Sequence, residues 1–268
     1  MRLRAFAALL CAAAALSGCE ENAVQSIDVP AVGAQVRFFN FGLNAPGVNF
    51  YANEMKMTAT STAACTPPTD PACTTTGLES TTGVTYGNIV ASGLYSTVAP
   101  GQYNLTGRIA AATDKDLPIS TVAASLADGM AYSFYQSGLY NTTTKKSDAF
   151  IVEDPIPATV DFSVAQVRFV NAIHNSNPMT LYAKSTVDGQ EYAIGGPVAY
   201  KSAGTFTPVP GASYDLSTRV TGSTTNVIVR TAVSFVAGRV YTISSRGDMT
   251  VTGTTATNRP FLDNTANR

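Results

Sequence analysis

The sequence contains no tryptophan, a single histidine and few charged residues, which make up 13% of its 268 residues. Zinc sites and acid–base catalysts most often use histidine, so this scarcity argues against both. The 17 basic residues do not exceed the 18 acidic ones, whereas nucleic-acid-binding proteins usually carry a basic excess. Beyond the N-terminal segment, no apolar run approaches the length of about 20 residues that a membrane-spanning helix needs. We therefore expect no metal, cofactor or nucleic acid to be bound.

The residues that are abundant favour β-structure. Apolar residues make up 45% of the chain, which is ordinary for a folded protein, and threonine is frequent beside 12 tyrosines and 12 phenylalanines. Side chains that are β-branched or aromatic fit a pleated sheet, while the 21 glycines and 14 prolines supply turns. No segment has a clear helical period. An all-β protein is expected.

The N-terminal segment has the pattern of an export signal. Arg2 and Arg4 precede an apolar run over residues 5–16, which is too short to span a membrane and is typical of a secretory signal peptide. The run ends in Leu-Ser-Gly-Cys at residues 16–19, which resembles the lipobox of bacterial lipoproteins.

The lipobox resemblance implies a lipid-anchored protein. It implies that residues 1–18 are removed and that Cys19 is acylated; two or three acyl chains hold a protein at a membrane almost permanently. Glu20 stands where enterobacterial inner-membrane lipoproteins tend to have aspartate, which favours the outer membrane, facing either the periplasm or the cell surface. Residues 19–33 are expected to form a tether. The alternative is cleavage after residues 13–15 and secretion of a protein with a free thiol.

The rest of the chain contains an internal duplication. The sequence Ala-Gln-Val-Arg-Phe occurs at residues 34–38 and again at residues 165–169. Further matches preserve the same order in both copies, which indicates duplication rather than chance. The later matching blocks are residues 100–108 with 210–219 and residues 129–132 with 238–241.

The duplication predicts two tandem domains, each long enough to bury its own core. We expect domain 1 at residues 34–152 and domain 2 at residues 164–268. Residues 153–163 contain two prolines at alternate positions and are expected to form an extended, semi-rigid linker. A long insertion near residues 56–83 interrupts the first copy.

Within each copy, apolar and polar residues alternate. In residues 103–109 and 214–220 the apolar side chains share one face and the polar side chains share the other, as in antiparallel sheets with one buried face. Together with turn signals at sandwich spacing, this pattern predicts two antiparallel β-sandwiches of the immunoglobulin-like or Greek-key type. Residues 128–132, Asp-Gly-Met-Ala-Tyr, are typical of a sandwich corner where the tyrosine hydroxyl returns to nearby backbone.

A family resemblance lies in the Val-Arg-Phe-Val-Asn sequence at residues 167–171, the Asn/Ala/Pro loop that follows, and the later Pro-Gly-x-Tyr strand. These residues resemble the bacterial envelope family catalogued as domain of unknown function 4397. The resemblance covers most of residues 34–136 and 165–247. It implies small β-sandwich domains, often in pairs, on secreted or lipid-anchored proteins, and it implies no known reaction. The insertion in the first copy departs from the family pattern.

The insertion contains two of the four cysteines. Cys65 and Cys73 form an isolated pair that should be a disulfide in an exported chain, worth about 2.5 kcal/mol in the chain-entropy model. A redox or metal pair is the alternative, but it would lack both a CxxC spacing and a neighbouring histidine. Of the other cysteines, Cys11 lies in the predicted signal peptide. Residues 58–82 are too polar to form core and are the best candidate for a recognition loop.

Four arginines match between the copies, Arg37 with Arg168 and Arg108 with Arg219. The alternation places all four on the polar face. They could bind an anionic sugar or phosphate bidentately, or pair with cross-strand partners in a solvated sheet face.

Other polar residues indicate no site. His174 is a lone histidine in an expected loop, and the matched Asn40 and Asn171 are expected to supply a turn or a backbone hydrogen bond. The aspartates are scattered rather than paired at glycosidase or calcium-loop spacing. The aspartates considered are Asp114, Asp116, Asp128 and Asp148.

We expect a non-enzymatic envelope lipoprotein with a structural, adhesive or binding role. Its expected partners are the membrane, through the lipid, and an envelope protein or glycan. The alternative is a carbohydrate-binding module in which Tyr95, Tyr135 and Tyr140 are exposed and stack on sugar rings, although the absence of tryptophan counts against it. An enzyme is the third and least favoured reading.

Overall fold

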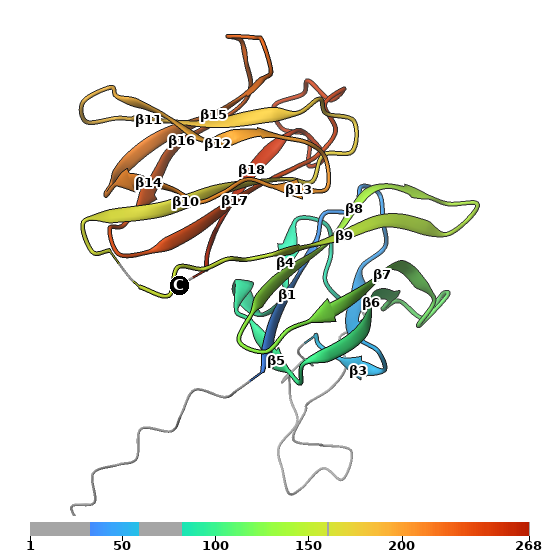
Figure 1. Ribbon diagram of the computed structural model, residues 1–268. Helices are drawn as coiled ribbons and strands as arrows, with labels where there is room; N and C mark the ends of the chain where they lie inside the picture. Colours follow the sequence, from blue (N-terminus) through green and yellow to red (C-terminus); the bar gives the residue numbers. More distant parts are fainter. Residues whose placement is uncertain (1–32, 59–81, 160, 268) are drawn as a thin grey trace, which may run out of the picture. The chain divides into compact units, whose positions relative to one another are not determined.

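The computed structural model describes residues 33–58, 82–159 and 161–267, which belong to one compact unit. The described residues are nearly all β and form four sheets in two pairs, so the predicted pair of β-sandwiches is confirmed (Figure 1). A short 3-10 turn at Val90–Gly93 interrupts the strands. In the described part of the chain, no helix has the length and apolar character needed to cross a membrane.

The first sandwich is built from the strands before the predicted linker. They are β1 (Ala34–Asn40), β2 (Val48–Ala52), β3 (Met55–Lys56), β4 (Asn88–Ile89), β5 (Ser96–Val98), β6 (Gly101–Ile109), β7 (Pro118–Leu126), β8 (Ala131–Asn141) and β9 (Lys146–Glu153). The second sandwich is built from the strands after the linker. They are β10 (Val164–Asn171), β11 (Met179–Ser185), β12 (Glu191–Val198), β13 (Ser202–Ala203), β14 (Thr207–Pro210), β15 (Ala212–Val220), β16 (Asn226–Phe235), β17 (Val240–Arg246) and β18 (Phe261–Ala266).

The two sandwiches have the same strand order. In the first, one sheet runs β4-β1-β8-β9, with β5 also paired to β1, and the other runs β3-β2-β6-β7. In the second, one sheet runs β13-β10-β17-β18, with β14 also paired to β10, and the other runs β12-β11-β15-β16. Each strand therefore has a counterpart nine places later, and the sequence repeat is a structural repeat.

One strand pair in each sandwich is parallel, β1 with β8 and β10 with β17, while the other named pairs are antiparallel. A parallel pair needs a long crossover, and the strands of the second sheet supply it. The equivalent registers join Val36 to Tyr132 and Val167 to Tyr241. These registers define which residues of the two copies are equivalent.

The apolar faces predicted by alternation pack between the paired sheets. In the first sandwich, the rings of Phe38 and Phe50 stack with centroids 5.2 Å apart. In the second, Phe235 of one sheet packs on Tyr241 of the other with centroids 5.1 Å apart. Leu105 is buried, as the alternation in its strand predicts.

The predicted tyrosine corner is present in both copies. The Tyr132 hydroxyl accepts a hydrogen bond from the backbone N–H of Ala127 at 3.1 Å, and the Tyr241 hydroxyl accepts one from Val236 at 3.1 Å. In both copies the donor of this hydrogen bond is a backbone N–H, so the bond does not need the side chain of the aspartate in the predicted motif. The second copy therefore keeps the corner although Ala237 replaces the aspartate of the first.

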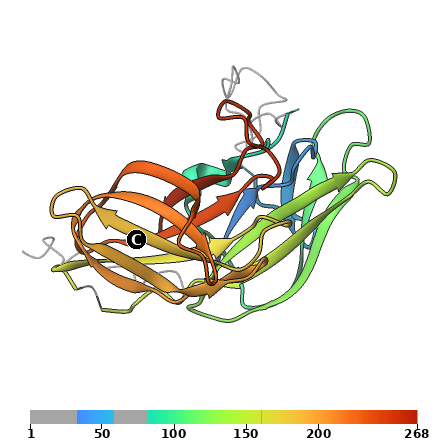
Figure 2. The same cartoon turned by 90° about the horizontal axis from the view of Figure 1, so that it is seen from above.

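The copies differ mainly in two connections. Residues 57–87 join β3 to β4, whereas residues 199–201 make the equivalent connection in the second copy. Conversely, residues 247–260 join β17 to β18, red in Figure 2, whereas residues 142–145 suffice between β8 and β9. Each copy thus has one long connection of its own.

Several predictions concern residues outside the described ranges. They are the signal peptide, Cys11, acylated Cys19, the tether as far as residue 32, and the Cys65–Cys73 disulfide within the insertion.

Candidate functional site

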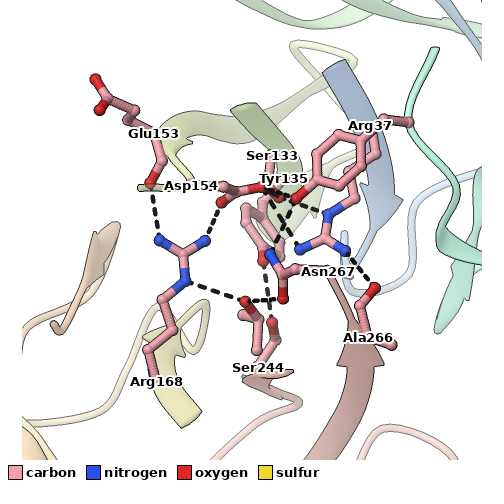
Figure 3. A network of polar contacts seen from close by, with 11 residues as sticks. Arg37, Ser133, Tyr135, Glu153, Asp154, Arg168, Ser244, Ala266 and Asn267 are labelled. Carbon is pink, nitrogen blue, oxygen red and sulfur yellow. Dashed lines mark hydrogen bonds and ion pairs between the residues drawn. The ribbon is translucent and has the colours of Figure 1, made fainter. Parts of the chain in front are cut away.

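A buried polar cluster joins the two sandwiches at the ends of β9 and β18 (Figure 3). Its guanidinium groups come from Arg37 on β1 and Arg168 on β10, and each residue is only 1% exposed. The expected solvent-facing position is therefore wrong for this matched pair. The alternation correctly turns both side chains away from the core of their own sandwich, but the other sandwich covers that second face.

Asp154 provides the carboxylate of the cluster, and its side chain is 0% exposed. Arg168 Nη2 donates to its Oδ1, and Arg37 Nη2 lies 3.5 Å from its Oδ2. The Ser133 hydroxyl donates to Oδ2 at 2.6 Å and the Tyr95 hydroxyl donates to the same atom at 2.5 Å. A buried carboxylate is tolerated when charges and donors surround it in this way.

The cluster is built from equivalent residues of the two copies. Arg37 Nε donates to Ser133 Oγ at 2.8 Å, and Arg168 Nε donates to Thr242 Oγ1 at 3.0 Å. Ser133 then donates to Asp154, while Thr242 donates to Asn267 Oδ1 at 2.8 Å. The equivalent pairs, from the strand registers, are Arg37 and Arg168, Ser133 and Thr242, Glu153 and Ala266, Asp154 and Asn267, Tyr95 and Phe206, and Tyr135 and Ser244.

Each arginine also crosses to the other sandwich. Arg37 Nη1 donates to the carbonyl of Ala266 at 3.2 Å, and Arg168 Nη1 donates to the carbonyl of Glu153 at 2.8 Å. Tyr135 contacts its own equivalent, because its hydroxyl lies 3.0 Å from Ser244 Oγ. Reciprocal contacts of this kind define an isologous interface, as in a two-fold symmetric dimer. The two sandwiches are thus joined as a covalently linked pseudo-dimer.

Aromatic rings complete the interface. The Arg37 guanidinium carbon lies 4.6 Å from the ring centroid of Tyr95, and that of Arg168 lies 5.0 Å from the ring centroid of its equivalent, Phe206. Beside them, Tyr135 stacks on Phe39 with centroids 4.4 Å apart. Cation–π contacts and apolar packing therefore add to the ion pairs. The buried apolar cluster comprises Phe39, Phe41, Tyr135 and Phe150 with Val170 and Ala172.

The symmetry is broken at its charged centre. Two guanidinium groups share one carboxylate, because Asn267 replaces the equivalent of Asp154. Tyr95 bridges the difference, since its hydroxyl accepts from Asn267 Nδ2 at 3.0 Å and donates to Asp154. Burial raises the pKa of Tyr95, and the Asp154 charge raises it further, so the hydroxyl stays protonated at neutral pH.

The second matched pair of arginines lies on the outer sheets. Arg108 binds both carboxylate oxygens of Glu54, at 2.9 and 2.8 Å, and Arg219 binds both of Glu191, at 2.8 and 2.6 Å. Each guanidinium also lies over a matched tyrosine ring, with 4.4 Å to the centroid of Tyr51 and 4.1 Å to that of Tyr182. Each guanidinium of this pair therefore has a carboxylate partner, but neither carboxylate lies on a strand paired with that of its arginine: Glu54 lies between β2 and β3, and Glu191 lies on β12.

A polar pocket of about 520 Å³ surrounds Arg108 on the first sandwich. Its walls carry amides, hydroxyls and carboxylates together with the apolar ring of Pro118. The lining residues are Asn53, Glu54, Asn104, Thr106, Arg108, Asp116, Pro118 and Thr121.

Most of the other residues considered in the sequence form turns or ion pairs within the chain. Asn40 and Asn171 are fully buried, and each side-chain oxygen accepts from the backbone N–H two residues later, at 3.1 Å in both copies, so the predicted turn role is confirmed. His174 lies in the connection between β10 and β11. Asp148 pairs with Lys201 at 2.7 Å, and Asp114 pairs with Lys145 at 2.6 Å. Among the described residues, no group of three metal-ligating side chains occurs.

The tyrosines expected to stack on sugars are not exposed. Tyr135 is completely buried between the sandwiches. Tyr95 turns its hydroxyl into the polar cluster, and Tyr140 packs partly buried against the first core. Tyr135 and Tyr95 thus contribute to the sandwich interface, whereas Tyr140 packs on the core of the first sandwich.

Sequence reasoning missed Asp154, which was assigned to the linker, and it missed the burial of Arg37 and Arg168. One signal was available. Phe38 and Phe39 are consecutive apolar residues, and so are Phe169 and Val170. Consecutive apolar residues in a strand indicate that both of its faces are covered.

A comparison with known protein families found no match, and a comparison with curated proteins found no similar protein. The resemblance to the domain of unknown function 4397 therefore stays a prediction based on short motifs.

Proposed function

We propose that the chain is a non-enzymatic component of a bacterial cell envelope, whose paired sandwiches form one rigid structural or binding unit. The observation that carries this proposal is the isologous interface centred on Arg37, Asp154 and Arg168. A scaffold needs its two domains in one fixed arrangement, because the binding surfaces on the two domains then keep the same distance and orientation.

The buried cluster supports a structural rather than a catalytic role for its residues. The Asp154 carboxylate has no exposed surface, and its oxygens already accept from Ser133, Tyr95 and Arg168. A catalytic carboxylate must reach the proton or carbon on which it acts. These atoms are instead engaged in holding the sandwiches together.

Limited proteolysis tests the rigid unit. We expect the wild-type linker near residues 155–159 to resist cleavage, because the preceding Asp154 is locked between the sandwiches. Asp154→Ala should increase the cleavage rate in this linker by at least tenfold while each sandwich remains folded by circular dichroism. Equal cleavage of wild type and Asp154→Ala would contradict the rigid-unit proposal. Glu191→Ala, which removes a surface carboxylate, is the matched control.

The envelope location rests on the lipobox resemblance at residues 16–19, with Cys19 as the lipidated residue. Detergent partition and intact mass of wild type against Cys19→Ala test it. We expect wild type in the detergent phase with added lipid mass, and Cys19→Ala in the aqueous phase. Wild type without lipid mass in the aqueous phase would remove the anchor from the proposal.

Carbohydrate binding is the second candidate, and the polar pocket around Arg108 supports it. Amide, hydroxyl and carboxylate groups such as Asn104, Thr106 and Asp116 can exchange hydrogen bonds with sugar hydroxyls. A glycan array with wild type and Asn104→Ala tests this candidate. Hits that Asn104→Ala loses would support it, and an array without hits would exclude it.

A further inference from the structure

Two equivalent corners of the sandwich interface are filled differently. Tyr86 precedes β4 and Tyr200 precedes β13 at equivalent positions, because Asn88 pairs with Asn40 as Ser202 pairs with Asn171. The residues that follow the two tyrosines, Gly87 and Lys201, share a left-handed backbone, with φ of 80° and 66°. The backbone is thus repeated while the side chains differ.

The corner around Tyr200 is closed. Its hydroxyl lies 2.8 Å from Ser137 Oγ and donates to Asp148 Oδ2 at 3.1 Å. Lys201 Nζ donates to Asp148 Oδ1 at 2.7 Å. A carboxylate from β9 of one sandwich therefore satisfies both donors from the other sandwich.

The corner around Tyr86 lacks that carboxylate. By register, Arg246 occupies the position of Ser137, and Phe261 occupies the position of Asp148. The Tyr86 hydroxyl is buried, and no described residue accepts its proton. Buried hydroxyl groups almost always have a hydrogen-bond partner, so this one calls for an acceptor.

A pocket of about 370 Å³ is open at this corner. Residues 86–88 of the first sandwich form one wall, while Arg246, Thr257, Arg259 and Phe261 of the second form the rest. Gly87 contributes no side chain, and a Cβ at this position would lie 3.1 Å from the guanidinium carbon of Arg246. Two stretches of the wall belong to the connections by which the copies differ, residues 86–87 and Thr257 with Arg259, and the other lining residues lie at the ends of β4, β17 and β18.

The polar groups of this pocket are mainly donors. Arg246 Nε donates to Asp263 Oδ2 at 2.5 Å, and the guanidinium group lies against Gly87. Arg259 Nη1 donates to the carbonyl of Ala256 at 3.1 Å, and no carboxylate of the described residues pairs with Arg259. Both guanidiniums lie beside Phe261, at 5.0 and 5.4 Å from its ring centroid.

Two carboxylates lie near this corner, and both have donors of their own. Asp263 pairs with Arg246, while Asp248 Oδ1 accepts from Thr250 and Asn175. Burial raises the pKa of Tyr86, so its hydroxyl remains a donor at neutral pH. Of the two guanidiniums in the pocket, Arg246 therefore has a carboxylate partner, whereas no carboxylate of the described residues pairs with Arg259.

We propose that this pocket binds the carboxylate of a small anionic ligand, which takes the place that Asp148 holds in the closed corner. Arginine pairs bind oxyanions through strong, charge-assisted hydrogen bonds, and Tyr86 borders the same pocket from the opposite sandwich. The volume suits a small organic acid or a single acidic sugar ring. Because its walls come from both sandwiches, the site rests on the paired arrangement in the proposed function, but it does not depend on the lipid anchor.

Titration of the purified full chain with glucuronate, glucose and inorganic phosphate, followed by calorimetry, tests the site. Glucuronate should bind at least tenfold more tightly than neutral glucose. Binding of phosphate within tenfold of glucuronate would support recognition of the oxyanion alone, whereas weaker phosphate binding would support recognition of a carboxylate on a sugar. Glucuronate affinity no greater than that of glucose would overturn the proposal.

Variants locate the binding. Arg259→Gln should weaken glucuronate binding about tenfold or more, since it removes a charge-assisted bond. Arg230→Gln is the matched control, because Arg230 contacts the same Phe261 ring, at 5.3 Å, without lining the pocket; its affinity should stay within about twofold of wild type. Equal affinity of wild type and Arg259→Gln would overturn the proposal.

A further variant supplies the missing carboxylate from the chain itself. Gly87→Asp places an acid beside Arg246 at a left-handed position that aspartate tolerates better than most residues. It should abolish glucuronate binding, and circular dichroism checks that the variant folds, because the new Cβ would lie 3.1 Å from the guanidinium carbon of Arg246. A folded Gly87→Asp that still binds glucuronate as wild type does would contradict the assigned location.

Discussion

The two matched pairs of arginines differ in what covers them and in how they share carboxylates. The side chains of Arg37 and Arg168 are 0% and 1% exposed, whereas those of Arg108 and Arg219 are 19% and 20% exposed. All four lie on the polar side of an alternating strand, and all four contact an aromatic ring. A strand therefore specifies the face of an arginine, while the neighbouring domain decides whether that face meets water.

The difference in cover has an energetic consequence. A guanidinium removed from water loses hydration and must be compensated by a carboxylate and hydrogen bonds, so losing its partner costs several kcal/mol. An ion pair in contact with water is worth about 1 kcal/mol or less, because solvent screens it. Arginines that all lie on the polar side of a strand should thus respond very differently to substitution.

The largest expected effect follows from removing the shared carboxylate. Asp154→Ala leaves two buried guanidiniums without their counter-charge and should lower the free energy of unfolding by about 3–5 kcal/mol. Urea denaturation monitored by circular dichroism measures it. Glu191→Ala, which removes a surface carboxylate, should cost about 1 kcal/mol or less. Similar losses of unfolding free energy in Asp154→Ala and Glu191→Ala would show that burial does not make the Arg37–Arg168 pair more sensitive than the Arg108–Arg219 pair.

The arginines themselves give the second test. Arg168→Met keeps most of the aliphatic chain but removes the bonds to Asp154, Glu153 and Thr242, and should cost about 2–4 kcal/mol. Arg219→Met should cost no more than about 1 kcal/mol in the same denaturation experiment. A larger loss of unfolding free energy in Arg219→Met than in Arg168→Met would contradict the role given to burial.

The third test concerns the Tyr95 hydroxyl, which donates a hydrogen bond to the one carboxylate that Arg37 and Arg168 share. Tyr95→Phe gives the first copy the aromatic residue that the second has at Phe206, and removes the hydrogen bond to Asp154. Because that bond is made to a charged group, the loss should be about 1.5 kcal/mol by urea denaturation. Tyr182→Phe, at the exposed Arg219, should change stability by about 0.5 kcal/mol or less. A neutral Tyr95→Phe would show that Asp154 does not need this donor.

The smallest expected effect is a pH dependence of the exposed pair. The hydrogen bond from Arg219 lowers the pKa of Glu191 below its ordinary value of 4.5. The resulting stabilisation is present above that value and is lost as the pH falls through the lower pKa of the folded state. The difference in unfolding free energy between wild type and Glu191→Gln should be at most about 1 kcal/mol at pH 7 and shrink towards pH 3. A difference that grows on acidification would contradict this sign.

Much of the repeated framework could be predicted because it is local. Alternation in residues 103–109 indicates a half-buried strand, Asn40 and Asn171 form the turns that their side chains favour, and Tyr132 forms its predicted corner. Each of these features depends on contacts within one strand or with backbone a few residues away. The duplication also implied that each copy repeats the same strand order.

The interface could not be predicted in the same way. Asp154 follows the last strand of the first copy and, in sequence, belongs to a proline-containing linker. Only the contact with Arg168 of the second copy makes it the centre of a buried cluster. The sugar-stacking interpretation of Tyr135 failed for the same reason, since a tyrosine facing outward from one sandwich faces inward once a second sandwich packs on it.

Composition, alternation and the repeat by themselves determined an all-β chain with two copies of one sandwich, because strand period and turn chemistry act over a few residues. The tertiary structure alone decided which matched arginines lose water, which carboxylate they share, and which of two equivalent corners stays open. Those outcomes depend on residues more than a hundred positions apart meeting across the interface, as Arg37 does with Ala266 and Tyr135 with Ser244. A local pattern contains no information on which surface will cover another.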